Sequence, residues 1–371
     1  MGLTESVSNR RQLPAGLSGV SVVVAVLVYL VVDLAVKLTG TTVLAFGFHV
    51  IGGSLSVGSL LSMVIDGLLV GLAVGLAGIG LSMTYSILDF ANFAHGDTVT
   101  AGAFLGWVAA YVVAGLGSGA AFADLFLFDT GQQLSVISAF LPVLIGLVVA
   151  GGGTVGVVLL VDRLTYRPMR GSDNISLLIA SIGVALALRY LIAFVFGTQT
   201  SGVASSGARL QLIPGLAVTD NEIALLVVSV GLMLGVHLLL QRTKLGKAMR
   251  AMADNEDLAR VTGIPTERVI RLTWVLGGAL AGIGGYLLVL ESGTISFNFG
   301  WILLLLIFAA VIVGGIGSIY GAMAGGVLIG LVDSLALIWL PSGLTRAAAF
   351  AVLIAVLLLN PSGLFSGVST A

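Results

Sequence analysis

Long apolar stretches, each about the length of a membrane-spanning helix, constrain this sequence more than any other feature. A helix that crosses a bilayer needs about 20 predominantly apolar residues. The chain has ten such stretches, at 17–39, 59–80, 98–116, 138–161, 176–197, 221–240, 271–291, 301–316, 319–340 and 344–360. The eighth and ninth are separated by glycines, and a single broken hairpin there would reduce the count to nine. The sequence therefore predicts an all-α polytopic membrane protein with about ten transmembrane helices, some of them broken at Gly-rich segments.

Composition excludes several classes of protein. Charged residues make up 9% of the chain and hydrophobic residues 58%, whereas a soluble domain has about 25% charged residues. A soluble enzyme or nucleic-acid binder is therefore excluded, and the net charge of −1 gives no overall field for nucleic acid. The chain has no Cys, no P-loop, no HExxH and no GxSxG motif. We expect no enzymatic activity, no metal site and no cofactor bound by this chain.

Lys and Arg in the short loops predict the orientation of the spans, because cytoplasmic loops carry the excess of these residues. They cluster before the first span, at 163–170 and at 242–271, and all three places fall on one side of a ten-span count. The opposite loop 117–137 has no Lys or Arg, and 198–220 has Arg209 alone. We therefore expect a multi-pass cell-membrane protein whose N- and C-termini are both cytoplasmic. Residues 1–371 would form one transmembrane domain, with 1–58 as an extra span and outer loop.

A polar segment at 85–97 interrupts the pattern between the second and third spans. It includes Asn92, His95 and Asp97, and lipid would penalise these polar groups unless they face protein or water. One interpretation is a hydrogen-bonded turn at the membrane edge. The alternative is a part of the transport path or its gate.

The longest polar stretch, at 241–271, predicts a short amphipathic helix broken into two pieces. Its apolar residues recur at helical spacing, and the acidic run 254–257 breaks the pattern. Acidic and basic residues alternate on its polar face, which favours docking to a protein partner over lying on lipid. A solvated loop is the alternative interpretation.

A third segment, 314–322, contains four glycines between two apolar spans. Glycine-interrupted spans expose backbone groups near binding sites, which makes Gly315 and Gly317 candidates for the transport path. A tight turn explains the same glycines equally well. Elsewhere, GxxxG spacings such as Gly278/Gly282 predict close helix packing.

Ionisable residues lie inside several predicted spans, namely Asp66, Arg189, Glu291 and Asp333, with Asp33 near one end of the first span. Each costs on the order of 3 kcal/mol at the bilayer centre if it has no partner. Arg189 needs a carboxylate or carbonyl partner, which Asp66 or Asp333 would be able to supply. An internal ion pair is one interpretation of these charges, and a substrate-binding or gating group is the other.

Taken together, these segments resemble one known family, the LivH-type permeases of branched-chain amino acid ABC importers. The resemblance rests on GLSMTYSILDFANFAHGD (80–97), YRPMRGSDNISLLIASIGVAL (166–186), TKLGKAMRAMADNEDLARVTGI (243–264) and VGGIGSIYGAMAGGVLIGLVDS (313–334). These motifs stand in the family's order, and NPSGLF (360–365) resembles its RPxGLFG ending. Two departures are Asp97, where the family usually has Glu, and Asn360, where it usually has Arg.

The resemblance implies a permease subunit that imports branched-chain amino acids. ATP would be hydrolysed by two cytoplasmic ABC ATPase subunits, a second related permease chain would complete the path, and an external solute-binding protein would deliver the substrate. The polar stretch 241–271, called the coupling loop below, would contact the ATPases through Lys247, Arg250, Glu256 and Arg260. The substitution Arg250→Glu is expected to uncouple transport from ATP hydrolysis.

Two alternatives remain open at this point. One is a permease of the same ABC class that carries urea or a short amide, because related permeases share the segment around Asn92 and His95. An ion-gradient-driven secondary transporter or channel would use Asp66, Arg189 and Asp333 as an ion relay, but it leaves the mixed-charge loop without a role. An integral-membrane scaffold explains none of the broken spans.

Overall fold

The computed structural model describes residues 19–45, 49–119, 134–204 and 207–365. Arg10, Arg11 and most of the predicted loop 117–137 lie outside these ranges. Within them the chain forms two compact units, 1–57 and 58–371. The prediction of one permease domain over 1–371 stays a prediction.

The first unit has one helix and one β-hairpin. Helix α1 covers Gly19–Leu38, and strands β1 (Thr42–Ala45) and β2 (His49–Gly52) pair antiparallel, with Thr42 opposite Gly52. Asp33 connects the two parts, because it forms an ion pair with Lys37 and its Oδ1 accepts a hydrogen bond from the Gly52 N–H at 2.7 Å. The predicted extra span therefore ends in a hairpin that its own helix holds in place.

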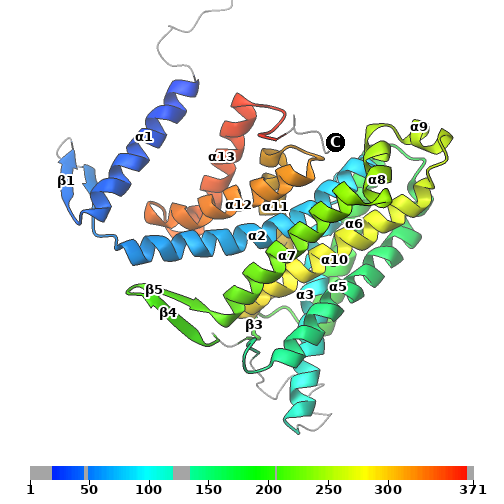
Figure 1. Ribbon diagram of the computed structural model, residues 1–371, viewed down its shortest axis with the longest axis horizontal. Helices are drawn as coiled ribbons and strands as arrows, with labels where there is room; N and C mark the ends of the chain where they lie inside the picture. The colour runs from blue at the N-terminus through cyan, green and yellow to red at the C-terminus, as the bar shows by residue number, and fades with distance from the viewer. Residues whose placement is uncertain (1–18, 46–48, 120–133, 205–206, 366–371) are drawn as a thin grey trace, which may run out of the picture. The chain divides into compact units, whose positions relative to one another are not determined.

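The second unit is helical, as the hydropathy pattern predicts (Figure 1). Its helices are α2 (Val57–Leu88), α3 (Ala94–Gly117), α5 (Phe140–Val161), α6 (Asn174–Phe196), α7 (Asp220–Arg242), α8 (Lys244–Asp254), α9 (Glu256–Val261), α10 (Thr266–Ser292), α11 (Phe299–Gly314), α12 (Ile319–Leu335) and α13 (Thr345–Leu359). Short helical turns η1 (Asp162–Tyr166), η2 (Arg167–Met169), η3 (Ala336–Ile338) and η4 (Ser342–Leu344) extend α5 and link α12 to α13. The remaining strands pair as β3 (Ser201–Gly202) with β6 (Thr294–Ile295), and β4 (Arg209–Ile213) with β5 (Leu216–Thr219).

Nine helices of the described residues are long and apolar enough to cross a membrane, and α11, with 16 residues, is a shorter apolar tenth. All ten lie where the sequence predicts a span, which confirms the all-α polytopic architecture. Several boundaries differ from the prediction, for example the start of α10 at Thr266 rather than 271, and two of them concern the polar segment. Helix α2 continues eight residues past 80, and α3 begins at Ala94 rather than 98. Helix α3 can begin inside the polar segment because the side chains of His95 and Asp97 have partners inside the protein.

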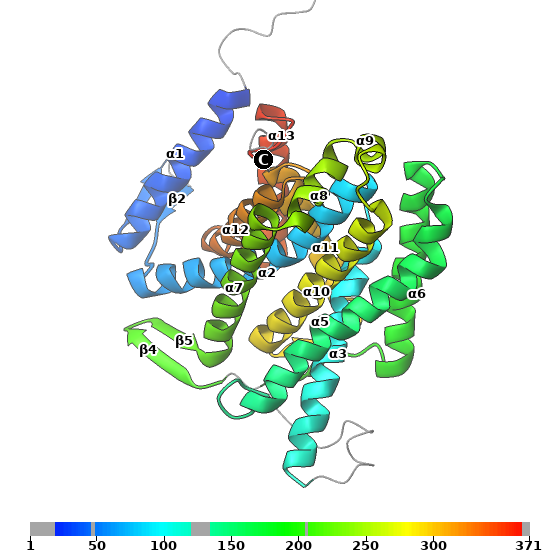
Figure 2. The same cartoon turned by 45° about the vertical axis from the view of Figure 1, so that its right-hand side comes forward.

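Burial separates the central helices from those on the outside of the bundle. In the most apolar stretch of each helix, 72% of the residues of α10 and 61% of those of α3 are buried. The corresponding shares are 17% for α6 and 11% for α13. Helices α3, α5 and α10 pack against one another in both ribbon views (Figures 1 and 2). The exposed surfaces of α5, α6 and α7 carry large apolar side chains, which is the arrangement expected where helices face lipid.

Glycines allow the central helices to approach backbone to backbone. A Cβ atom built on Gly300 of α11 would lie 1.9 Å from the Gly96 carbonyl oxygen of α3, and one on Gly282 of α10 would lie 2.4 Å from the Ala150 carbonyl oxygen of α5. Such approaches need residues without a side chain. They bring α10 against α5, and α11 against α3, the helix whose first turn carries the predicted polar residues.

The Gly300→Ala variant should destabilise the bundle, because overpacking of a core usually costs about 1–3 kcal/mol. The matched control is Gly231→Ala in α7, where an added Cβ meets no atom within 4 Å. Thermal unfolding of the purified chain in detergent measures both. A lower Tm for Gly300→Ala alone is the expected result, and equal Tm values would contradict the close α3–α11 contact.

Candidate functional site

The polar segment forms a short turn, 89–93, and the buried first turn of α3. Asn92 organises the turn: its Oδ1 accepts hydrogen bonds from the Ala94 N–H at 3.1 Å and from the Tyr166 hydroxyl at 3.1 Å. Tyr166 in turn stacks on Trp274 of α10, with ring centroids 5.2 Å apart and planes 4° apart. Asn92 is therefore held by both a neighbouring backbone group and a tertiary contact.

His95 lies in the first turn of α3 and is buried, with 3% of its surface exposed. Its Nε2 lies 2.8 Å from the Ala77 carbonyl oxygen of α2. Because a carbonyl oxygen only accepts hydrogen bonds, Nε2 carries the proton in this contact. The imidazole thus ties α3 to the middle of α2.

Asp97 is completely buried and pairs with Arg189 of α6. The Arg189 Nε lies 2.9 Å from Asp97 Oδ1, and its Nη2 lies 2.8 Å from Asp97 Oδ2, a bidentate geometry. The guanidinium carbon also lies 4.3 Å from the ring centroid of Trp301 on α11, within the range of a cation–π interaction. The three side chains bring α3, α6 and α11 together at one buried charged centre.

This pair corrects the sequence expectation for Arg189. Neither Asp66 nor Asp333 is its partner, because the carboxylate comes from α3 instead. Asp66 lines a separate cavity with Arg209 and Glu222. Asp333 has a buried Oδ1 without a hydrogen-bond partner among the described residues. Among the described residues, no ion pair therefore joins Arg189 to Asp66 or Asp333, the other two members of the ion relay expected of a gradient-driven transporter.

The glycine segment separates α11 from α12 as a tight turn. Gly315 and Gly317 have φ angles of +108° and +83°, which favour glycine. The segment after α13 covers this turn, since Leu364 N–H donates to the Val313 carbonyl at 2.9 Å and Phe365 N–H to the Gly314 carbonyl at 3.0 Å. Gly317 lies beside Ser86 of α2. A role of these glycines in the transport path stays a prediction.

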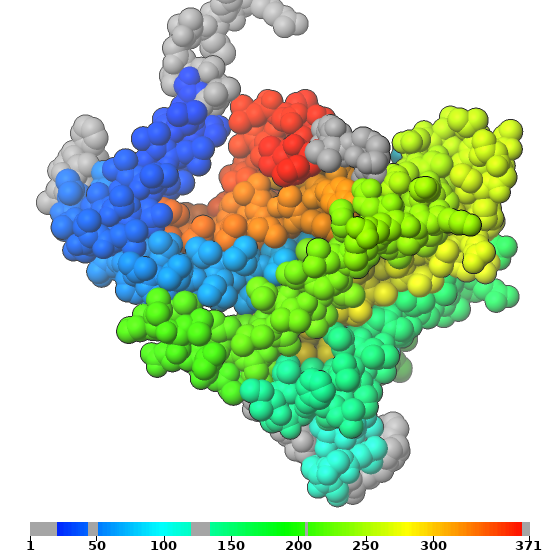
Figure 3. Space-filling model, in the orientation of Figure 1, coloured from blue at the N-terminus to red at the C-terminus, as the bar shows by residue number. Residues whose placement is uncertain are grey.

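The coupling loop folds into two helices, α8 and α9, divided at Asn255. The Asn255 side chain accepts a hydrogen bond from the Leu258 N–H at 2.9 Å, which caps the second helix. Met249 and Met252 of α8 are buried against the bundle, at 4% and 3% exposure. On α9, in contrast, Leu258 is 61% and Val261 85% exposed. Figure 3 shows this segment in yellow-green at the edge of the second unit.

The four predicted contact residues occupy different positions. Glu256 and Arg260 form an exposed ion pair at 2.7 Å on α9, and Lys247 lies exposed on α8. The Arg250 guanidinium donates to the Leu240 carbonyl oxygen of α7 at 2.7 Å. Arg250→Glu would therefore break a contact within the chain as well as alter the loop surface, so it does not isolate a partner contact.

Sequence reasoning missed two residues of these sites. Tyr166 and Trp301 contact Asn92 and Arg189 from distant helices, and no local pattern marks them. Leu258 and Met249 both belong to the predicted apolar face of the loop. Only the structure shows that Leu258 is exposed whereas Met249 is buried. An aromatic residue beside a run of arginines, as at Tyr166, is the one signal that sequence alone offers.

The model for the branched-chain amino acid transport system permease component family matches residues 63–359. The chain belongs to this family. It is 30% identical to the high-affinity branched-chain amino acid transport system permease protein BraD of Pseudomonas aeruginosa, over 82% of this chain and 95% of that protein. It is also 30% identical to the corresponding permease protein LivH of Escherichia coli K12, over 82% of this chain and 94% of that protein. A solved structure of a metal-chelate type ABC transporter in an inward-facing conformation is more distant, with 17% sequence identity and a TM-score of 0.43. The match covers 90% of this chain and 98% of that chain.

Membership in this family confirms the resemblance seen in the sequence. As a family member the chain is a multi-pass membrane permease component rather than an enzyme, and the relatives do not favour the scaffold or the gradient-driven transporter. The matched region begins at 63 and so excludes the N-terminal unit, 1–57, which the sequence marks as additional.

Proposed function

We propose that this chain is the permease subunit of an ABC importer for branched-chain amino acids, driven by ATP that separate ATPase subunits hydrolyse. The observation that carries the proposal is the family match over 63–359, together with relatives of that named activity along most of their length. The chain itself binds no ATP in this scheme. Urea or a short amide is the alternative substrate class.

The α8–α9 segment supports an ATPase contact at the cytoplasmic face. Exposed Leu258 and Val261 lie beside the Glu256–Arg260 ion pair, so α9 presents apolar contact area with charges around it. Interfaces commonly combine such an apolar centre with a polar rim. Under this proposal, a cytoplasmic α9 also places the N- and C-termini in the cytoplasm, as the distribution of Lys and Arg predicts.

Packing provides a route from this surface to the polar turn. The buried Met249 of α8 belongs to the same apolar cluster as Ile87, at the end of α2, and as Tyr166. Ile87 lies two residues before Asp89, which adopts a positive φ of +54° where the chain turns towards α3. A displacement of α8 would therefore act on the turn that holds Asn92 and leads to His95. Coupling of this kind requires that both ATP and substrate bias the same two-state element.

The remaining parts of the proposed importer lie outside this chain. Two ATPases would bind below, a second related permease would complete the path, and an external solute-binding protein would deliver the amino acid. Asn92, His95 and Asp97 are our candidates for the path or gate.

Affinity purification from native membranes in mild detergent, followed by mass spectrometry, tests the assembly. We expect P-loop ATPase subunits and a second permease chain to be recovered with the tagged chain. Recovery of the chain alone, in a preparation that preserves a control ABC complex, would contradict the proposal.

Substrate choice needs a separate measurement. The purified assembly, reconstituted in vesicles with its binding protein and ATP, should accumulate radiolabelled leucine in preference to urea and acetamide. Accumulation of urea or acetamide in preference to leucine would replace the proposed substrate while leaving the importer mechanism intact.

A further inference from the structure

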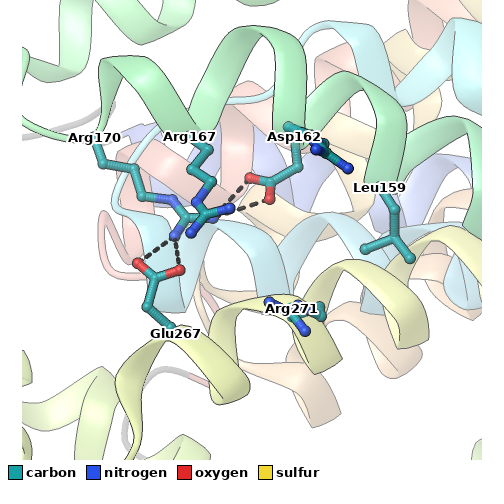
Figure 4. Close-up of a pocket in the computed structure, with 7 residues that line it drawn as sticks. Leu159, Asp162, Arg167, Arg170, Glu267 and Arg271 are labelled. Atoms are coloured by element: carbon teal, nitrogen blue, oxygen red, sulfur yellow. Dashed lines mark hydrogen bonds and ion pairs between the residues drawn. The ribbon is translucent and has the colours of Figure 1, made fainter.

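The arginines of the YRPMRG segment have no role in the function proposed above, yet they line a cationic cavity. The cavity has a volume of about 270 Å³ and lies between the end of α5 with its turns η1 and η2 and the start of α10. Its lining consists of Leu159, Asp162, Arg163, Arg167, Arg170, Glu267 and Arg271. Four guanidinium groups thus face two carboxylates (Figure 4).

One arginine forms ion pairs with both carboxylates. Arg170 contacts Asp162 at 2.9 and 3.0 Å and Glu267 at 2.5 Å, and Figure 4 shows it between the two. Its Nε is buried without a hydrogen-bond partner among the described residues. Four arginines against two carboxylates leave the lining with a net charge of +2. Of the other guanidiniums, those of Arg167 and Arg271 act on Glu267 only from beyond ion-pair distance.

These other guanidiniums belong to Arg163, Arg167 and Arg271. Within the described part of the chain they form no ion pair or side-chain hydrogen bond, and all three residues are exposed. Guanidinium groups match the geometry of phosphate oxygens and bind them bidentately. The cavity is therefore suited to an anion that carries a phosphate group.

The position of the cavity favours a lipid over a free ion. It lies where the apolar helix α5 ends, and Leu159 contributes an apolar wall. Next to it, Leu160 and Leu164 are 57% and 68% exposed, so apolar surface continues from the guanidiniums along the helix. Basic pockets between transmembrane helices are known to bind lipid headgroups.

We propose that this cavity binds the phosphate of an anionic membrane phospholipid, with the acyl chains along the exposed surface of α5. Arg163, Arg167 and Arg271 contact the phosphate, while the Asp162–Arg170–Glu267 network holds α5 and α10 at the distance that forms the cavity. This inference does not depend on which substrate the permease carries.

Thermal unfolding of the purified full chain with added phosphatidylglycerol or phosphatidylcholine tests the proposal. The test variant is the double substitution Arg167→Gln/Arg271→Gln, and the matched control is Arg268→Gln, an exposed arginine of α10 that does not line the cavity. Phosphatidylglycerol should raise the Tm of the wild type and the control more than phosphatidylcholine does. Each basic residue near a membrane surface contributes about 1 kcal/mol, so the double variant should bind phosphatidylglycerol about 30-fold more weakly.

Two further arms separate the sources of the effect. Equal stabilisation of the wild type by soluble glycerol phosphate would overturn the lipid assignment in favour of a free anion. Unchanged phosphatidylglycerol binding by the double variant would overturn the proposed site. If co-purification then showed that the double variant no longer recovers the ATPase, the cavity would be assigned to the partner protein. An unaltered Tm of the double variant in phosphatidylcholine shows that its fold is intact.

Discussion

Replacing Asp97 by Asn is expected to abolish most amino acid uptake and to lower the free energy of unfolding by about 3–5 kcal/mol. Removal of one partner of a buried ion pair leaves the other charge without compensation, and Arg189 is only 11% exposed in its side chain. Uptake into reconstituted vesicles and thermal unfolding in detergent measure the two effects. Arg189→Gln should have a similar effect on both.

Two further variants separate an ion pair from a general loss of charge. Asp333→Asn is the matched control, because Asp333 is an intramembrane carboxylate without an ion pair in the described chain. It should change the stability little. The double variant Asp97→Asn/Arg189→Gln should recover stability relative to either single variant, because neither charge is then left alone.

Uptake by the double variant decides the role of Asp97. Recovery of stability without recovery of uptake supports a place for Asp97 in the path or gate. Recovery of both would mean that the pair only joins α3 to α6, and the assignment of Asp97 to the path would then be wrong. Equal stabilities of Asp97→Asn and Asp333→Asn would contradict the ion pair itself.

The double substitution Leu258→Glu/Val261→Glu is expected to prevent recovery of the ATPase subunits and to abolish ATP-dependent uptake. Full burial of a Val or Leu side chain contributes about 1.5–3 kcal/mol, and Glu at both positions replaces this gain with unpaired charges, so binding should weaken by about 1,000-fold for the pair. Both side chains are exposed in this chain, so insertion and the Tm of the permease should remain unchanged. Co-purification and mass spectrometry provide the measurement.

The control for this variant is Leu212→Glu on β4, which is 54% exposed. Strand β5 precedes α7 and α8 follows it, so the β4–β5 hairpin lies at the opposite end of α7 from the coupling segment. Leu212→Glu should leave the recovery of ATPases unchanged. Undiminished ATPase recovery by the Leu258→Glu/Val261→Glu variant would show that the partner does not bind this surface of α9.

Much of the fold was readable from local sequence. Each span satisfies its backbone hydrogen bonds within itself, so about 20 apolar residues are enough to place a helix without knowledge of its neighbours. The break at Asn255 and the turn at Gly315 and Gly317 were readable for the same reason, since capping and positive φ angles are local properties. The motif around Asn92 and His95 also marked the polar turn correctly.

The pairing of side chains between helices was not readable in this way. The sequence indicated Asp66 or Asp333 as the partner of Arg189 and did not indicate Asp97, because hydropathy places a charge at a depth but not on a facing helix. The choice follows from how α3, α6 and α11 pack, and Gly96 and Gly300 bring α3 and α11 together there. Likewise, Arg250 looked like an exposed contact until its distance to the Leu240 carbonyl was known.

By itself, the sequence determined that this chain is a polytopic helical membrane protein with a polar turn, a broken amphipathic loop and a glycine-rich turn, and it pointed to the permease family. These properties depend on residues that are neighbours along the chain. Only the tertiary structure decided which charges are paired, which face of α8–α9 is free and where four arginines gather. Those features depend on contacts between residues about 90 or more positions apart, as in Asp97–Arg189 and Arg170–Glu267, which arise only once the helices have packed.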